Sequence, residues 1–60
     1  MIPQDPVMLL SFINMKLRDD YGNLEALAEG LDISSDELQG IVDKLKALGY
    51  EYSQEHNKFI

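Results

Sequence analysis

The chain has 60 residues, with 11 acidic and 5 basic side chains, which gives a formal net charge of −6 at neutral pH. This length predicts one domain, residues 1–60, whose stability is marginal because a short chain buries little surface. The sequence contains no cysteine, which excludes disulfides and zinc–thiolate sites and fits a cytoplasmic location. The negative charge disfavours nucleic acids and anionic membranes, and no apolar run approaches the roughly 20 residues of a membrane helix.

A first helix is predicted from Pro6 to about Asp20. Asp5 can cap its free amides, and Pro6 suits the first helical position because it has no N–H to satisfy. Gly22 is the expected stop. The helical period places four aliphatic side chains in one stripe that should face the core: Leu9, Leu10, Ile13 and Leu17.

A short second helix should follow, capped by Asn23 and ended or loosened by Gly30. Its inner face consists of Leu24, Leu27, Ala28 and Leu31. The third helix has the clearest start, because Ser34 and Glu37 fit a capping box and Ile33 and Leu38 fit a hydrophobic staple.

The third helix also has a clear end. Its apolar stripe consists of Leu38, Ile41, Val42, Leu45 and Leu48. Gly49 should then stop the helix in the left-handed conformation, with Tyr50 packing back on Leu45.

The C-terminal residues predict a short β-hairpin with strands at 50–53 and 58–60. Tyr50 and Tyr52 alternate with polar residues, and Asn57 can adopt the positive φ that the turn needs. Because a lone hairpin is unstable, we expect it to lie against the helices. The predicted fold class is mainly α: a three-helix, helix-turn-helix core with a C-terminal, winged-helix-like hairpin.

The second and third helices resemble a helix-turn-helix. The pattern is Leu27-Ala28-x-x-Leu31-x-Ile33-Ser34, followed by Leu38 and Ile41. With the Gly49-Tyr50 exit and the hairpin, residues 23–60 are similar to a minimal winged helix. Asp32 stands where that motif usually has glycine, and aspartate tolerates a left-handed backbone better than most residues.

The whole chain resembles a family of short bacterial proteins known as domain of unknown function 4250. The residues that carry this resemblance are Met1-Ile2-Pro3, Asp5-Pro6-Val7, Leu9-Leu10-Ser11, Asn14, Leu17-Arg18-Asp19, Tyr50-Glu51-Tyr52 and Asn57-Lys58-Phe59. The resemblance implies a stand-alone bacterial protein and brings no activity, ligand or catalytic residue with it.

Nucleic-acid binding is the function that a helix-turn-helix suggests first. The candidate contacts, on the third helix and the hairpin, are Ser35, Gln39, Lys44 and Lys58. Gln39 has the amide needed to read adenine. Asp36 and Glu37 at the start of the same helix would meet phosphates and be repelled. A nucleic-acid-binding regulator is therefore the alternative rather than the favoured function.

No catalytic site, metal site or cofactor is predicted. His56 is the single histidine and lies in a predicted turn, and no serine has a base at a recognisable spacing. The acidic corner at Asp19 and Asp20 does not match the spacing of a calcium loop. Two acids at the C-terminal end of a helix oppose its dipole, so we expect Arg18 or a partner's cation to offset them.

The favoured function is a non-enzymatic protein interaction through the first helix. Besides its core stripe, this helix has a second apolar face made of Met8, Phe12 and Met15. Two interpretations stay open. Either the hairpin, with Met1-Ile2 or Phe59, covers part of this face, or the face is an exposed interface for a partner or for a homodimer.

Asn14 and Arg18 lie on a polar stripe of the same helix. The amide of Asn14 either satisfies a nearby backbone group or belongs to a recognition stripe, in which Arg18 offers its planar fork to a partner's carboxylate. The candidate partner-binding residues are therefore Met8, Phe12, Met15, Asn14 and Arg18. The expected partner is a protein or a second copy of the chain, with no small-molecule substrate.

Overall fold

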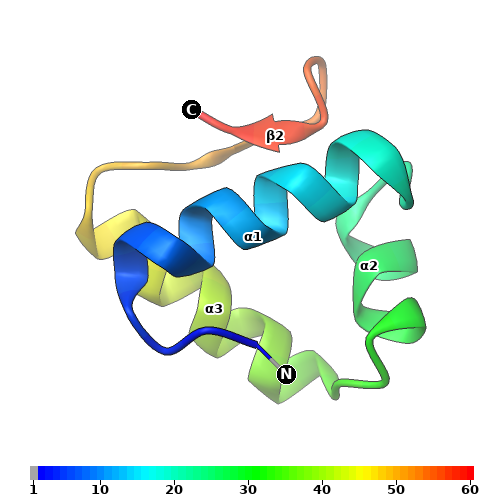
Figure 1. Ribbon diagram of the computed structural model, residues 1–60, viewed down its shortest axis with the longest axis horizontal. Helices are drawn as coiled ribbons and strands as arrows, with labels where there is room; N and C mark the ends of the chain where they lie inside the picture. Colours follow the sequence, from blue (N-terminus) through cyan, green and yellow to red (C-terminus); the bar gives the residue numbers. More distant parts are fainter. Residues whose placement is uncertain (1) are drawn as a thin grey trace.

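The computed structural model describes residues 2–60 as three helices followed by one hairpin. The helices are α1 (Pro6–Asp19), α2 (Leu24–Gly30) and α3 (Ser35–Ala47), and the strands are β1 (Tyr52–Ser53) and β2 (Lys58–Phe59). In Figure 1, α1 runs through the middle of the molecule, with the hairpin along one side and with α2 and α3 on the other. The prediction of a mainly α fold with a C-terminal hairpin is confirmed, and the hairpin packs on α1.

Each helix begins at a side chain that accepts a hydrogen bond from a free backbone amide. Asp5 accepts from the amide three residues on at 3.0 Å, and Asn23 does the same at 2.7 Å. The Ser34 hydroxyl accepts from the Glu37 amide at 3.1 Å, and the Glu37 carboxylate accepts from the Ser34 amide at 3.3 Å. All three predicted caps are confirmed, because capping depends on residues close together in the sequence.

Helix α3 ends in a Schellman motif around Gly49, whose φ is 95°. The Gly49 amide donates to the Lys46 carbonyl at 2.9 Å, and the Tyr50 amide donates to the Leu45 carbonyl at 3.1 Å. The predicted link between Tyr50 and Leu45 is thus a backbone hydrogen bond, while the Tyr50 side chain stays 38% exposed.

Helix α2 ends in the same motif, with Asp32 in the left-handed position at a φ of 57°. The Asp32 amide donates to the Glu29 carbonyl at 3.2 Å, and the Ile33 amide donates to the Ala28 carbonyl at 3.0 Å. Aspartate therefore makes the turn between α2 and α3 in place of glycine, as its tolerance of this conformation predicts.

Two predicted details are wrong. Gly22 is not the stop of α1, since the helix ends at Asp19 and Gly22 does not take a positive φ. Instead, the Lys16 carbonyl accepts from two successive amides, at 2.8 and 3.0 Å, and closes the last turn. Leu48, expected in the apolar stripe of α3, is 41% exposed because it follows the last helical residue, where the chain leaves the helix.

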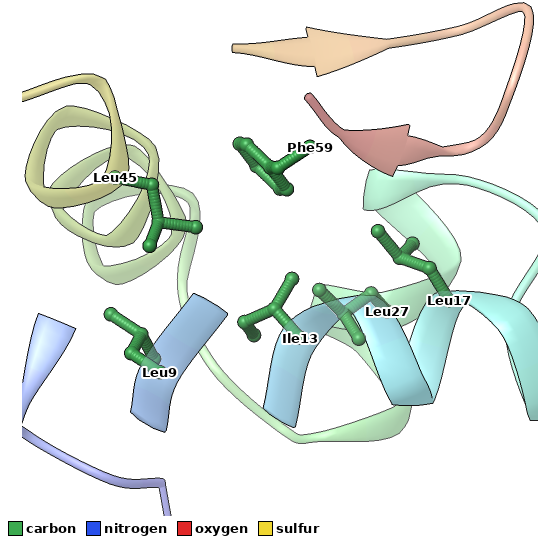
Figure 2. Close-up of a cluster of buried hydrophobic side chains, with 6 residues drawn as sticks. All are labelled: Leu9, Ile13, Leu17, Leu27, Leu45 and Phe59. Carbon is green, nitrogen blue, oxygen red and sulfur yellow. The ribbon is translucent and has the colours of Figure 1, made fainter. Parts of the chain in front are cut away.

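Six side chains from all three helices and β2 form the core (Figure 2): Leu9, Ile13, Leu17, Leu27, Leu45 and Phe59. Each is at most 2% exposed. Three of the four residues of the predicted α1 stripe are among them, and Leu10 is half-buried at the edge. In Figure 2 the Phe59 ring lies over the α1 side chains, facing Leu45 of α3. Burial of one such ring contributes about 1.5–3 kcal/mol, so Phe59 fastens the hairpin to the helices.

The two strands are shorter than predicted but pair in one register. Tyr52 lies opposite Phe59 and Ser53 opposite Lys58. The rings of Tyr52 and Phe59 are 5.6 Å apart at an interplanar angle of 58°, a favourable tilted arrangement. Two backbone hydrogen bonds between Glu51 and Ile60, at 2.9 and 3.0 Å, extend the pairing beyond the strands.

Gly30 and Gly40 should respond in opposite ways to the same substitution. A Cβ at Gly30 would run into the Tyr21 ring, whereas a Cβ at Gly40 would meet no atom within 4 Å. Gly30→Ala should therefore lower the free energy of unfolding by about 1–3 kcal/mol through overpacking. Gly40→Ala should raise it by about 0.5–1 kcal/mol through helix propensity. Urea unfolding measures both, and a stabilising Gly30→Ala would show that the Tyr21 ring moves aside without cost.

Candidate functional site

Two adjoining grooves lie along α1. The first, here called the apolar groove, is lined by Pro3, Val7, Met8, Ser11, Phe12 and Met15. The second, here called the hairpin groove, is lined by residues of α1 and of the hairpin: Ser11, Asn14, Met15, Leu17, Arg18, His56, Asn57 and Lys58. Because Ser11 and Met15 line both, the two grooves form one continuous surface.

The apolar groove contains three exposed apolar side chains. Val7 is 63%, Met8 61% and Met15 43% exposed. Phe12 differs, since it is half-buried and packs against the core, with the Lys16 ammonium 5.8 Å from its ring centre. The interpretation of an exposed face thus holds for the two methionines and in part for Phe12. Val7 was not predicted to belong to this face. Its spacing could have shown this, because Val7 lies one helical turn before Ser11 and two turns before Met15.

The N-terminal segment covers less of this face than one interpretation expects. Ile2 packs against the core, and Phe59 lies within the core. Met1, named with Ile2 as a possible cover, lies outside the described residues. Pro3 lines the apolar groove beside the exposed methionines.

Asn14 joins the middle of α1 to β2. Its amide nitrogen donates to the Phe59 carbonyl at 3.1 Å, and its amide oxygen accepts from the Phe59 amide at 2.8 Å. The side chain therefore pairs with β2 as a neighbouring strand would. Of the two interpretations of Asn14, the one in which its amide satisfies a backbone group is confirmed. The side chain therefore has a structural role.

Asn57 joins the hairpin turn to the end of α1. It takes the predicted left-handed conformation, with a φ of 52°. Its amide nitrogen donates to the carbonyls of Leu17 and Tyr21, both at 3.0 Å, and its oxygen accepts from the Tyr52 hydroxyl at 2.7 Å. Asn57 thus supplies from the hairpin the cap that Gly22 was predicted to provide at the C-terminus of α1.

Two ion pairs neutralise the acids at the end of α1. Arg18 binds Asp19 in a bidentate way, through Nε and Nη2 at 2.8 and 2.9 Å, and Lys16 lies 3.4 Å from Asp20. The hydrogen bonds from Arg18 hold the pKa of Asp19 below its usual value and raise that of Arg18 itself. Of the two expected sources of positive charge, Arg18 is thus the one that pairs with Asp19, whereas Asp20 is paired with Lys16, which the sequence did not single out.

The hairpin groove gathers basic side chains that are far apart in the sequence. Arg18 comes from α1, His56 from the turn and Lys58 from β2. Within residues 2–60, the side chains of His56 and Lys58 make no hydrogen bond or ion pair. Sequence reasoning assigned these three residues to separate roles. The predicted hairpin is the sequence feature that could have placed them together, because a hairpin this short must pack against a helix.

The four nucleic-acid candidates do not share one surface. Ser35 is exposed at the start of α3, and the Gln39 amide donates to Asp43 at 3.0 Å. Lys44 reaches the Gln4 carbonyl at 3.5 Å, in a different groove from the one that Lys58 lines. The geometry therefore places the two lysines among these candidates in different grooves.

No group of three or more metal-ligating side chains lies together within residues 2–60. In the same part of the chain, no helix has the length and apolar character needed to cross a bilayer.

Comparison with known proteins identifies the family of this chain. A family model described as Domain of unknown function (DUF4250) matches residues 3–59. The chain belongs to this family. No curated protein and no solved structure matches it. Three of the residues that carried the DUF4250 resemblance, namely Asn14, Asn57 and Phe59, are the ones that attach the hairpin to α1.

Asn57 should stabilise this DUF4250 domain through its amide as well as its backbone. Asn57→Gly keeps the positive φ but removes three hydrogen bonds, and should lower the free energy of unfolding by about 1–3 kcal/mol. Asn57→Ala adds the strain of a left-handed alanine, about 1–2 kcal/mol more. Gln54→Ala, an exposed change in the same turn, is the control. Chemical denaturation measures all three, and an Asn57→Gly variant as stable as the wild type would contradict the role of the amide.

Proposed function

We propose that this protein is a non-enzymatic interaction module that binds another polypeptide through the outer surface of α1. The carrying observation is the group of exposed apolar side chains at Val7, Met8 and Met15 beside the half-buried Phe12. Contiguous apolar surface of this kind marks interaction sites in small proteins. Methionine side chains adapt to different shapes, which suits the binding of a peptide or helix.

A non-enzymatic role also fits the side chains that carry chemistry. His56 is the single histidine, and it is exposed in the turn, where its ring makes no hydrogen bond within residues 2–60 and only its backbone amide donates to Ser53. Each asparagine near the grooves serves the fold. The cysteine-free composition supports a cytoplasmic setting for the interaction.

The partner that we propose is a different polypeptide rather than a second copy. Two copies that each carry a charge of −6 repel one another, which opposes self-association through a small apolar patch. Sedimentation velocity should therefore find a monomer at high micromolar concentration. A dimer that Met8→Lys dissociates would instead make the second copy the occupant of the apolar groove.

Selection from a random peptide library displayed on phage tests the interaction. Peptides enriched on the immobilised protein should carry apolar residues, and Met8→Lys should weaken their binding about tenfold or more, because a buried apolar contact is replaced by a charge. Isothermal titration calorimetry with a synthetic copy measures the change. Ile60→Lys is the matched control, since Ile60 is 56% exposed against 61% for Met8 and lies outside both grooves.

Two results would sink the proposal: no enrichment above background, or equal binding by the wild type and Met8→Lys. Phe12→Lys is a poorer test. Phe12 packs against the core, so its replacement by lysine would also destabilise the fold.

A nucleic-acid-binding regulator is the second candidate. The observation in its favour is the order of the elements, in which α2, the turn at Asp32 and α3 precede a hairpin as in a winged helix. The charge of −6 and the acidic start of α3 at Asp36 and Glu37 oppose it. We expect no shift of a random DNA duplex at micromolar protein and physiological salt. A shift with a steep salt dependence would promote this candidate.

A further inference from the structure

The hairpin groove differs in charge from the rest of this acidic chain. Arg18 and Lys58 line it together with His56, and none of the residues that line it is acidic. The other basic residues lie elsewhere, since Lys16 is paired with Asp20 and the remaining two lysines belong to α3. The lining of this groove thus contains basic residues and no carboxylate, although the chain has a net charge of −6 and Arg18 is paired with Asp19.

Arg18 keeps free donors despite its pair with Asp19. A guanidinium has five N–H groups, and the pair uses one on Nε and one on Nη2, so three remain on the Nη1–Nη2 edge. The side chain is 74% exposed, which leaves that edge open to a ligand. A second carboxylate can therefore bind Arg18 in a bidentate way without displacing Asp19.

The fold brings His56 and Lys58 to the groove that Arg18 also lines. His56 and Lys58 flank Asn57, whose amide is fixed to the carbonyls of Leu17 and Tyr21. Leu17 immediately precedes Arg18 in the chain. The same hydrogen bonds that attach the turn to α1 thus hold His56 and Lys58 at the groove, which lowers the conformational cost of binding.

We propose that the hairpin groove binds a carboxylate of an acidic peptide segment whose neighbouring apolar side chain occupies the apolar groove. This inference rests on the proposed function and names the chemistry of its partner. Its structural basis is continuity, because Ser11 and Met15 line both grooves and bring the basic and apolar surfaces together. Arg18 and Lys58 supply the donors for the carboxylate, and the Ser11 hydroxyl is a further donor.

An acidic peptide fits this surface better than a nucleic acid does. A phosphate backbone needs several cations spaced along it, whereas this groove is lined by two formally positive residues, Arg18 and Lys58, beside apolar side chains. Acidic residues at the start of α3 would add repulsion. A peptide that combines carboxylates with apolar side chains complements both grooves at once.

The test compares two double variants that remove the same charge. Peptides enriched from the random library should contain Asp or Glu beside an apolar residue. Arg18→Gln with Lys58→Gln should weaken their binding about tenfold or more, because charge-assisted hydrogen bonds are lost. Lys44→Gln with Lys46→Gln, on α3, should leave binding unchanged within error. Circular dichroism confirms that both variants are folded, and calorimetry at physiological salt measures the affinities.

Replacing the carboxylates of the peptide by amides separates direct contact from overall charge. The wild type should bind the amide peptide more weakly than the acidic peptide. The loss should equal the one that the Arg18→Gln, Lys58→Gln variant shows for the acidic peptide. The variant itself should bind both peptides with the same affinity. Equal losses in both double variants would overturn the inference in favour of a general charge effect.

Failure of the inference differs visibly from failure of the proposed function. Enriched peptides that lack carboxylates but still depend on Met8 would overturn the carboxylate site and leave the interaction module standing. Peptides that depend on neither Met8 nor the Arg18–Lys58 pair would overturn both. Displacement of the acidic peptide by a DNA duplex at micromolar concentration would overturn the peptide assignment in favour of a nucleic acid.

Discussion

The attachment of the hairpin to α1 is the interaction on which the rest of the structure depends. Strands of two residues have no independent stability, and the hairpin persists because Phe59 enters the core and two asparagine side chains bond its backbone and turn to α1. Asn14 and Asn57 place their amides where polar backbone groups would otherwise lose water without replacement. Within residues 2–60, no buried side-chain polar atom lacks a hydrogen-bond partner. The polar contacts and the Phe59 ring thus close the core from the side that α2 and α3 leave open.

This arrangement makes α1 the centre of the molecule and also its exposed surface. One stripe of α1, Leu9, Ile13 and Leu17, is buried against α2, α3 and β2. Within residues 2–60, the opposite side of this helix keeps Val7, Met8 and Met15 exposed. The proposed interaction uses these exposed side chains together with Arg18 near the end of the helix.

The charged side chains are unevenly distributed over the surface of this protein. The net charge of −6 argues against phosphate binding by the whole surface, yet the end of α1 combines Arg18 and Lys58 in a groove without acidic lining residues. Arg18 serves two purposes there. It neutralises Asp19 at the unfavourable end of the helix dipole, and it keeps one edge of its guanidinium open. The pair therefore neutralises Asp19 while three N–H donors of Arg18 stay available in the groove.

Local sequence was sufficient for the helix starts, the left-handed turns at Asp32, Gly49 and Asn57, and the α1 core stripe, because each depends on residues within a few positions of one another. It also predicted the existence of the hairpin, but it left open whether the methionines of α1 are covered or exposed. Only the tertiary structure decided which hydrogen bonds end α1, where Asn57 replaces the expected Gly22 across 40 positions of sequence. The same applies to Phe12, half-buried by packing, and to the meeting of Arg18, His56 and Lys58. Helical periodicity orders side chains around one axis, whereas the contacts between distant segments follow from how the hairpin folds back on the helix.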